Sequence, residues 1–306
     1  MRTFRFAVRA VGPFSAARWT AKARRAEELG YSALLMPDHV IPQLSPVPAL
    51  AAAAAATSRL RVGVHVFDND YRNPLLLARE AATLDVVSGG RLELGLGAGW
   101  MASDYRQLGI PYDPPAMRID RLVEAISIIK RLFSGETVDH EGVHYRIRQA
   151  QLGPGPVQRP HPPFVIGGGG PRIMRIAARE ADIVSFIPQM TPQGRPRVRE
   201  ATAEATAAKV ANLRRAAGRR FEQLELCAFV VHANVADRAR PLRALGAGVE
   251  ALVRDLVDTP YVLAGSRAAI REQLLRYRDR LGISYWTIPV QAMEPFAPVA
   301  EALTGR

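Results

Sequence analysis

Cysteine is nearly absent from this chain of 306 residues, which has only Cys227. Disulfides and cysteine-rich zinc sites are therefore excluded. Cys227 lies in the apolar run 224–231, which predicts a buried strand where the thiol acts as a small hydrophobic group. Only His140 and His144 have helical spacing, and Gly142 lies between them in a predicted loop. The sequence therefore predicts no metal site.

Long apolar runs are missing as well. No stretch of about 18 uncharged apolar residues occurs, as a membrane-spanning helix would need. The first residues carry charge at intervals and lack the continuous apolar segment of a signal peptide. A Gly-x-Ser-x-Gly elbow and a P-loop lysine are also missing, so nothing supports a hydrolase or kinase. We expect a cytoplasmic protein without a membrane partner.

Acidic residues are fewer than basic ones, since 29 Asp and Glu face 41 Lys and Arg for a net charge of +12. The basic residues are scattered, with no nucleic-acid-binding motif or interleaved aromatic platform, so we expect no nucleic-acid partner. Acidic small molecules suit such a surface. The alternative is that the scattered basic residues are solvated surface side chains that bind no ligand.

The most informative feature present is a run of four glycines at 167–170, between the apolar segment 164–166 and Pro171. Proline favours the first position of a helix, and a helical pattern follows it. The loop amides and the positive end of that helix can close around a phosphate, because no side chains stand in the way. The alternative is a flexible turn.

Short β-type runs alternate with helical patterns along the whole chain, as in βα units around a parallel sheet. The predicted strands are residues 4–9, 32–36, 60–67, 92–96, 164–167, 183–187, 224–231 and 284–289. The predicted helices are residues 16–29, 47–57, 74–87, 116–133, 172–179, 197–217, 241–256 and 267–281.

Eight strands, each with a helix, predict a (β/α)8 TIM-type barrel with insertion loops at the C-terminal face of its strands. We expect one barrel domain over residues 1–306. Proline- and glycine-rich insertions near 140–163 and 188–196 interrupt the alternation, and loops of this kind commonly shape a substrate pocket.

Chemistry-bearing residues follow the second and fourth predicted strands. Asp38 and His39 follow the second, where catalysis or cofactor contact competes with a helix cap and a structurally satisfied histidine. The glycines of the fourth strand resemble a dinucleotide fingerprint, but Trp100 stands where its last glycine is required. We therefore interpret these glycines as steric, letting a flat ring lie against backbone.

Segments 73–85, 88–100 and 165–171, together with 263–266 and 282–287, resemble the luciferase-like superfamily. Its members are barrel oxidoreductases that use FMN or the deazaflavin coenzyme F420. The resemblance implies that Asp38 and His39 lie beside the reactive ring, and that a non-prolyl cis peptide at His65–Val66 supports its back. The residues that the resemblance assigns to cofactor binding are His65, Val66, Ala98, Gly99, Ser103, Gly168, Gly169 and Gly170.

The resemblance favours hydride transfer between C5 of F420 and a small organic substrate, with His39 as acid or base and Asp38 orienting or tuning it. Scattered arginines suit the anionic tail of that cofactor. The alternative is an FMN-dependent monooxygenase that uses reduced flavin and O2, and a third hypothesis is a non-catalytic cofactor-binding protein. Relatives are commonly dimers, so we expect a homodimer. Some relatives carry an acid where this chain has Trp100, so a mechanism using that carboxylate does not transfer.

Overall fold

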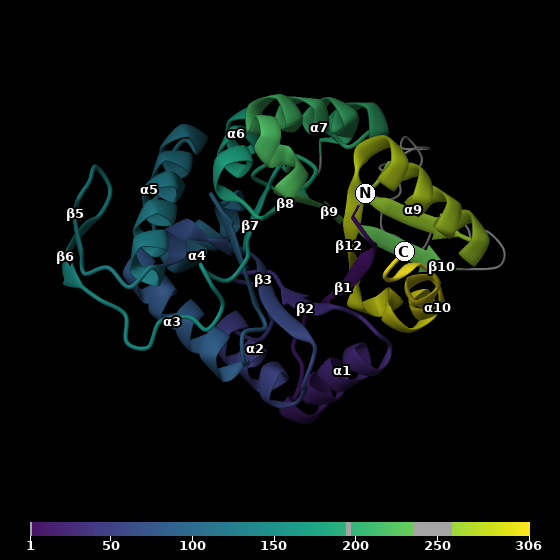
Figure 1. Cartoon of the computed structure of the whole chain (residues 1–306), viewed down its shortest axis with the longest axis horizontal. Helices are drawn as coiled ribbons and strands as arrows, with labels where there is room; N and C mark the ends of the chain where they lie inside the picture. Colours follow the sequence, from purple (N-terminus) through teal and green to yellow (C-terminus); the bar gives the residue numbers. More distant parts are fainter. Residues whose placement is uncertain (1, 194–196, 236–258) are drawn as a thin grey trace.

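Eight parallel strands close into a barrel in the computed structural model, which describes residues 2–193, 197–235 and 259–306 (Figure 1). Neighbouring strands follow the order β1-β12-β9-β8-β7-β4-β3-β2 around the barrel. Helices lie between the strands on the outside, so the predicted TIM-type fold is confirmed.

The barrel strands fall close to their predicted positions. Only the seventh is clearly shorter than expected, since it ends at Phe229 and a separate strand, β10 (His232–Val235), follows and pairs with β11 (Val262–Gly265). The barrel strands are β1 (Arg5–Arg9), β2 (Ala33–Met36), β3 (Arg61–Asp68), β4 (Leu92–Gly97), β7 (Phe164–Gly168), β8 (Ile183–Phe186), β9 (Glu225–Phe229) and β12 (Ile283–Pro289).

Most predicted helices are present, and polar caps or prolines mark their starts: Ser15 caps α1, for example, and Pro171 is the first residue of α6. The short α4 and the C-terminal α10 were not expected, and the helix expected at 241–256 lies outside the described residues. The helices are α1 (Ala16–Glu28), α2 (Pro46–Ala55), α3 (Pro74–Val87), α4 (Ala102–Leu108), α5 (Pro115–Phe133), α6 (Pro171–Glu180), α7 (Ala203–Ala217), α9 (Arg267–Leu281) and α10 (Met293–Leu303).

Two hydrophobic clusters follow from the alternation of side chains along the strands. The larger cluster lies between the strands and the helix layer and contains Phe6 and Val8 of β1. The smaller fills the inside of the barrel, with Ala7 of β1 among its members and Cys227, fully buried as expected, among the others. Odd-numbered residues of β1 therefore face the barrel interior.

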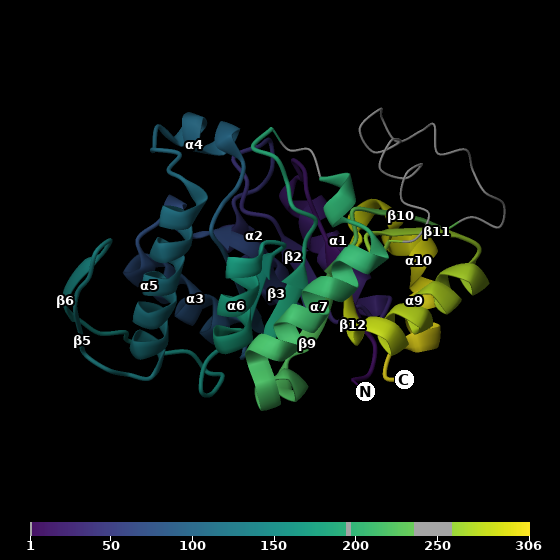
Figure 2. The same cartoon turned by 90° about the horizontal axis from the view of Figure 1, so that it is seen from above.

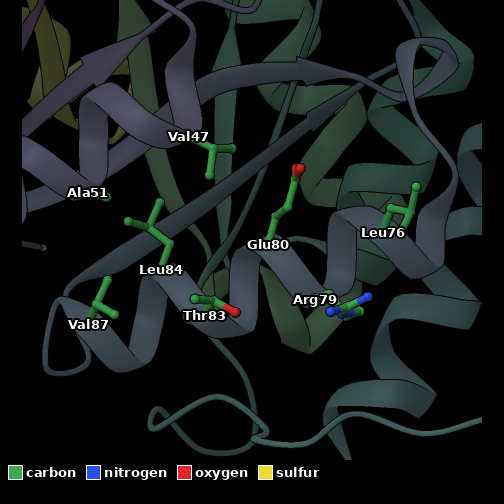
Figure 3. Close-up of a pocket in the computed structure, with 8 residues that line it drawn as sticks. All are labelled: Val47, Ala51, Leu76, Arg79, Glu80, Thr83, Leu84 and Val87. Atoms are coloured by element: carbon green, nitrogen blue, oxygen red, sulfur yellow. The ribbon is translucent and has the colours of Figure 1, made fainter.

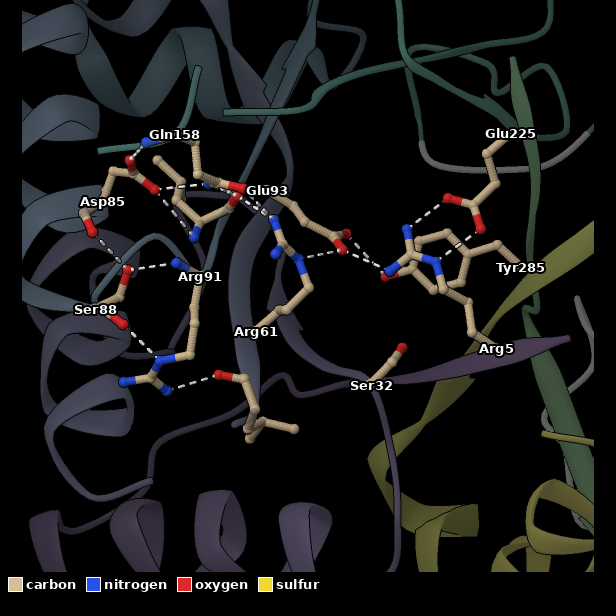
Figure 4. Close-up of polar contacts among 12 residues, drawn as sticks. Arg5, Ser32, Arg61, Asp85, Ser88, Arg91, Glu93, Gln158, Glu225 and Tyr285 are labelled. Carbon is tan, nitrogen blue, oxygen red and sulfur yellow. Dashed lines mark hydrogen bonds and ion pairs between the residues drawn. The ribbon is translucent and has the colours of Figure 1, made fainter. Parts of the chain in front are cut away.

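The amino-terminal end of the barrel is filled by an ion network (Figure 4). Glu93 is 1% exposed and accepts hydrogen bonds from Arg5 Nη1 at 2.6 Å, Arg61 Nε at 3.1 Å and Tyr285 Oη at 2.9 Å. Arg5 also forms a two-pronged pair with Glu225. Since active sites of such barrels lie at the other end, this network serves stability.

The insertion near 140–163 is more regular than expected, because it contains an antiparallel pair, β5 (Val138–Glu141) with β6 (Arg146–Ala150), at the outer edge of the molecule (Figure 1). The pair starts two residues before the predicted insertion. In the insertion near 188–196, residues 194–196 lie outside the described part of the chain. Across the described residues, no helix combines the length and apolar character needed to cross a bilayer.

Candidate functional site

The residues expected to form the site come from four strands that are consecutive in the barrel, β7-β4-β3-β2. Three of the sets lie at or just after the carboxyl end of their strand, and His65 and Val66 lie within the last four residues of β3, so all of them lie toward one rim. Figure 2 shows α4, which follows β4, at this end of the barrel and the two termini at the opposite end. The site therefore occupies the rim where barrel enzymes carry out catalysis.

His39 is held at this rim by a buried carboxylate. Its Nδ1 lies 2.7 Å from Oδ2 of Asp104, a residue of α4 that is 0% exposed. Trp100 meets the His39 ring edge-on, with ring centroids 5.2 Å apart. With the Nδ1 proton directed at Asp104, the imidazole presents Nε2 from a side chain that is 23% exposed. Nε2 is therefore the atom that can exchange a proton with a ligand.

The expectation that Asp38 orients His39 is wrong, because the side chain of Asp38 has other partners. Arg72 pairs with both of its carboxylate oxygens, at 2.6 and 3.2 Å, and the backbone N–H of Asp68 donates to it at 3.1 Å. Asp38 thus ties the end of β2 to the end of β3. Both residues lie in the loop after β2, which ends at Met36, so strand alternation does not fix their directions and each reaches a different partner.

The predicted bulge in β3 is present, and the peptide bond His65–Val66 is cis. The Val66 side chain is directed toward β4 and β7, where glycines leave room for it. A Cβ on Gly97 would lie 2.6 Å from Val66 Cγ2, and one on Gly167 would lie 3.2 Å from Val66 Cγ1. The steric role of these glycines is confirmed, but the group that they accommodate is Val66.

Gly99 has a similar reason to be glycine. Its φ is +69°, and a side chain there would overlap the hydroxyl of Tyr105 and the carboxylate of Asp68. Tyr105 donates to Asp68 at 3.2 Å. Burial, together with the neighbouring carboxylates of Asp70 and Asp38, raises the pKa of Asp68 from 3.8 to about 7. The rim thus holds a carboxyl group whose pKa lies near neutral pH.

The remaining residues assigned after β4 are held by an arginine. Arg118 of α5 is 3% exposed and donates to the carbonyl oxygens of Ala98, at 3.0 Å, and of Gly99. Ser103 lies in the first turn of α4, directly before Asp104 in the sequence. Arg118 therefore fixes the backbone that the resemblance assigns to the cofactor.

The glycine loop has the expected form, because β7 ends at Gly168 and Gly170 caps α6. A Cβ on Gly169 would lie 2.6 Å from the carbonyl oxygen of Ile187, whereas at Gly170 the closest atom is 4.0 Å away. The first amides of a helix have no partner within it, so the loop can present donors to a phosphate. The close approach of backbone at Gly169 excludes a side chain there.

Asp104, Arg72 and Arg118 are the functional candidates that sequence reasoning missed. Asp104 directly follows the assigned Ser103 and precedes a buried tyrosine, but nothing in that spacing shows that α4 turns it toward His39. A flavin-type cofactor fits the residues that are present, because a glycine cradle, a β3 bulge and buried polar groups converge on one rim. Within the described ranges, no cluster of three acidic, histidine or cysteine side chains could hold a metal.

A family model described as luciferase-like monooxygenase matches residues 3–280. Among curated proteins, the chain is 34% identical over 165 residues to an F420-dependent glucose-6-phosphate dehydrogenase of Microbacterium testaceum, an alignment covering 51% of this chain and 48% of the relative. The chain thus spans about half the length of the curated relatives it matches.

Two solved structures with the same fold use different chemistry. The F420-dependent tetrahydromethanopterin reductase of Methanopyrus kandleri has a TM-score of 0.77 at 19% identity, covering 97% of this chain and 98% of its own. A long-chain alkane monooxygenase, LadA, has a TM-score of 0.79 at 15% identity, covering 99% and 91%. At such identities these likenesses establish the fold alone.

Proposed function

The chain belongs to the luciferase-like monooxygenase family, and from that membership we propose that it is an oxidoreductase that transfers a hydride between coenzyme F420 and a small organic substrate. The observation that carries the proposal is the pair His39–Asp104 at the catalytic rim, beside the β3 bulge and the glycine loop. The F420-dependent glucose-6-phosphate dehydrogenases among its relatives favour this cofactor.

The cofactor-binding residues and the proton-transfer residue have separate roles. When bound, the deazaflavin supplies a carbon centre, C5, that accepts or donates a hydride. The amides of Gly168, Gly169 and Gly170 hold its phosphate, and the bulge at Val66 supports its ring. His39 takes up or releases a substrate proton at Nε2, while Asp104 holds the proton on Nδ1 and so fixes the orientation of the ring.

The second candidate is an FMN-dependent monooxygenase that uses reduced flavin and O2, which the description of the matching family as luciferase-like monooxygenase favours. A fluorescence titration of the apoprotein with F420, FMN and reduced FMN separates the two. Binding of F420 at micromolar or lower concentration, with weak binding of both flavin forms, is the expected result. Tight binding of reduced FMN without F420 binding would replace the first candidate with the second.

The variant His39→Ala tests catalysis separately from binding. We expect it to bind F420 as the unmodified protein does and to lose most hydride transfer, because only the proton-transfer group is removed. Unchanged transfer by this variant would remove His39 from the mechanism. Binding without any turnover by the unmodified protein, over a broad substrate screen, would support a non-catalytic cofactor-binding protein.

We also propose a cytoplasmic homodimer in which each chain, residues 1–306, forms one domain. A groove between α2 and α3 supports the dimer (Figure 3). Leu76 and Val87 are 52% and 56% exposed there, and Arg79 lies next to Glu80, so a two-fold axis would pair opposite charges. In analytical ultracentrifugation, Val87→Glu should sediment as a monomer and the unmodified protein as a dimer.

A further inference from the structure

Arg9 carries a buried charge without a carboxylate partner. It is the last residue of β1, faces the barrel interior at the catalytic end, and is 8% exposed. Its Nη2 donates to the carbonyl oxygen of Val230 at 3.0 Å, and its guanidinium lies 3.7 Å from the centroid of the Phe229 ring. Its Nη1 is buried and has no hydrogen-bond partner, and no described carboxylate forms an ion pair with Arg9.

Arg5, four residues earlier on the same face of β1, shows the usual arrangement. Its guanidinium pairs with both Glu93 and Glu225. A buried guanidinium without such partners is costly, because the charge loses its hydration without gaining an opposite charge. Burial lowers the pKa of Arg9 to about 10, so the side chain still carries its charge at neutral pH. An anion beside Arg9 would supply the opposite charge that the described residues do not provide.

His65 provides a second unpaired group at the same place. It is 4% exposed, its Nε2 lies 2.8 Å from Oγ of Ser185, and its Nδ1 is buried without a partner. Its ring centroid lies 5.6 Å from that of Phe229, the ring that Arg9 covers. Burial and the charge of Arg9 lower the pKa of His65 to about 3, so the imidazole is neutral.

An anion bound beside Arg9 would select the His65 tautomer whose proton is on Nδ1, in which the Ser185 hydroxyl donates to Nε2. The unpaired atoms Arg9 Nη1 and His65 Nδ1 are then both donors, and both groups lie against the Phe229 ring. Two such donors match an oxygen-bearing anion.

We propose that Arg9 and His65 form an oxyanion-binding site in the floor of the barrel mouth, which takes a carboxylate or a similarly delocalised oxyanion. Two sources share this chemistry: a carboxylate on the substrate, or the carbonyl-bearing edge of the deazaflavin ring in an anionic form. The site deepens the proposed function, on which it rests for the identity of the cofactor, by requiring a negative charge next to the reacting centre.

Thermal unfolding of the apoprotein at constant ionic strength tests the site directly. Acetate and benzoate are the probes, and acetamide and benzamide are their uncharged counterparts. We expect the carboxylates, and not the amides, to raise the Tm of the unmodified protein in a saturable manner. Arg9→Met should abolish that response, and Arg271→Met, on the exposed face of α9, should retain it.

The stability of Arg9→Met without ligand is a second measurement. Removal of an uncompensated buried charge should leave the Tm equal to or above that of the unmodified protein, whereas an arginine that only supports the fold would lower the Tm on removal. A lower Tm together with no carboxylate response in the unmodified protein would overturn the site.

Titration with F420 identifies the source of the anion. An affinity of Arg9→Met within twofold of the unmodified protein, with the carboxylate response lost, assigns the site to the substrate. A loss of at least tenfold in the F420 affinity of Arg9→Met assigns the site to the deazaflavin ring. If the unmodified protein binds no F420 but shows the carboxylate response through Arg9, the proposed cofactor fails and the oxyanion site stands. If Arg9→Met changes neither the carboxylate response nor the F420 affinity, the site is refuted.

Discussion

The most direct test of the catalytic rim is the substitution Asp104→Asn. In the structure, Asp104 is fully buried and accepts hydrogen bonds at Oδ2 from His39 Nδ1 at 2.7 Å and from the Tyr71 hydroxyl at 3.1 Å. Asparagine has nearly the same size but no charge. If its NH2 group faces the ring, it also favours the imidazole tautomer whose proton is on Nε2.

The size of the effect follows from the strength of that bond. A hydrogen bond to a charged group contributes about 1.5–3 kcal/mol, which corresponds to a loss of about 10- to 150-fold in kcat. Tyr71→Phe is the matched control, since it removes the other hydrogen bond to the same oxygen without touching His39. We expect a clearly smaller loss in this variant. F420 binding should stay within about twofold in both, because neither residue holds the phosphate.

Two measurements check the reasoning. The first follows F420 absorbance during turnover of the substrate identified by screening, for the unmodified protein and both variants. The second reads the tautomer of His39 from its ¹⁵N chemical shifts, and we expect the proton on Nδ1 in the unmodified protein. A proton on Nε2 alone, or a kcat of Asp104→Asn equal to that of Tyr71→Phe, would refute the orienting role of Asp104.

Three further predictions concern the fold and the rim. Burial raises the pKa of Asp68 to about 7, so its contribution to stability is lost as pH rises from its unfolded value of 3.8 through 7. In urea unfolding, the stability of Asp68→Asn relative to the unmodified protein should therefore rise between pH 5 and pH 8, by at most about 3 kcal/mol, and a constant difference would contradict this. Glu93→Gln should lower the free energy of unfolding by about 1.5–3 kcal/mol, since Arg5 and Arg61, both partly buried, each lose a charged hydrogen-bond partner, and a change below about 1 kcal/mol would exclude that role. Gly169→Ala should weaken F420 binding at least tenfold, because the added Cβ displaces the loop from Ile187. Gly170→Ala has room for its Cβ and should keep the Tm of the unmodified protein. An F420 affinity of Gly169→Ala equal to that of the unmodified protein would show that the loop holds no phosphate.

Much of the architecture could be predicted from the sequence. Alternating β and helical patterns indicated the barrel, because the period of apolar residues is a local property of the chain. The glycine loop before Pro171 was also predicted from its local pattern. The bulge at His65–Val66 was predicted only from the resemblance to the luciferase-like superfamily. The hairpin at 138–150 was missed, because the five prolines that follow it at 154–163 suggested that the whole insertion is an irregular loop, and because its strands lack clear alternation.

The partners of the site residues could not be predicted. Asp38 and His39 are adjacent in sequence, which suggested that they act together, yet Arg72 and Asp104 are the groups that bind them. These partners lie 34 and 65 positions away. Side-chain pairs at such separations depend on how α4 and the end of β3 meet at the rim.

By itself, the sequence determined the kind of fold and the chemical groups that the rim carries, because strand periodicity, glycine runs and proline positions act locally. The tertiary structure decided which groups face each other. Closure of the barrel brings Arg9 and His65 from two strands onto the same phenylalanine, and it leaves one polar atom of each without a partner. No local pattern contains that information, because an unsatisfied buried donor is a property of everything that surrounds it in space.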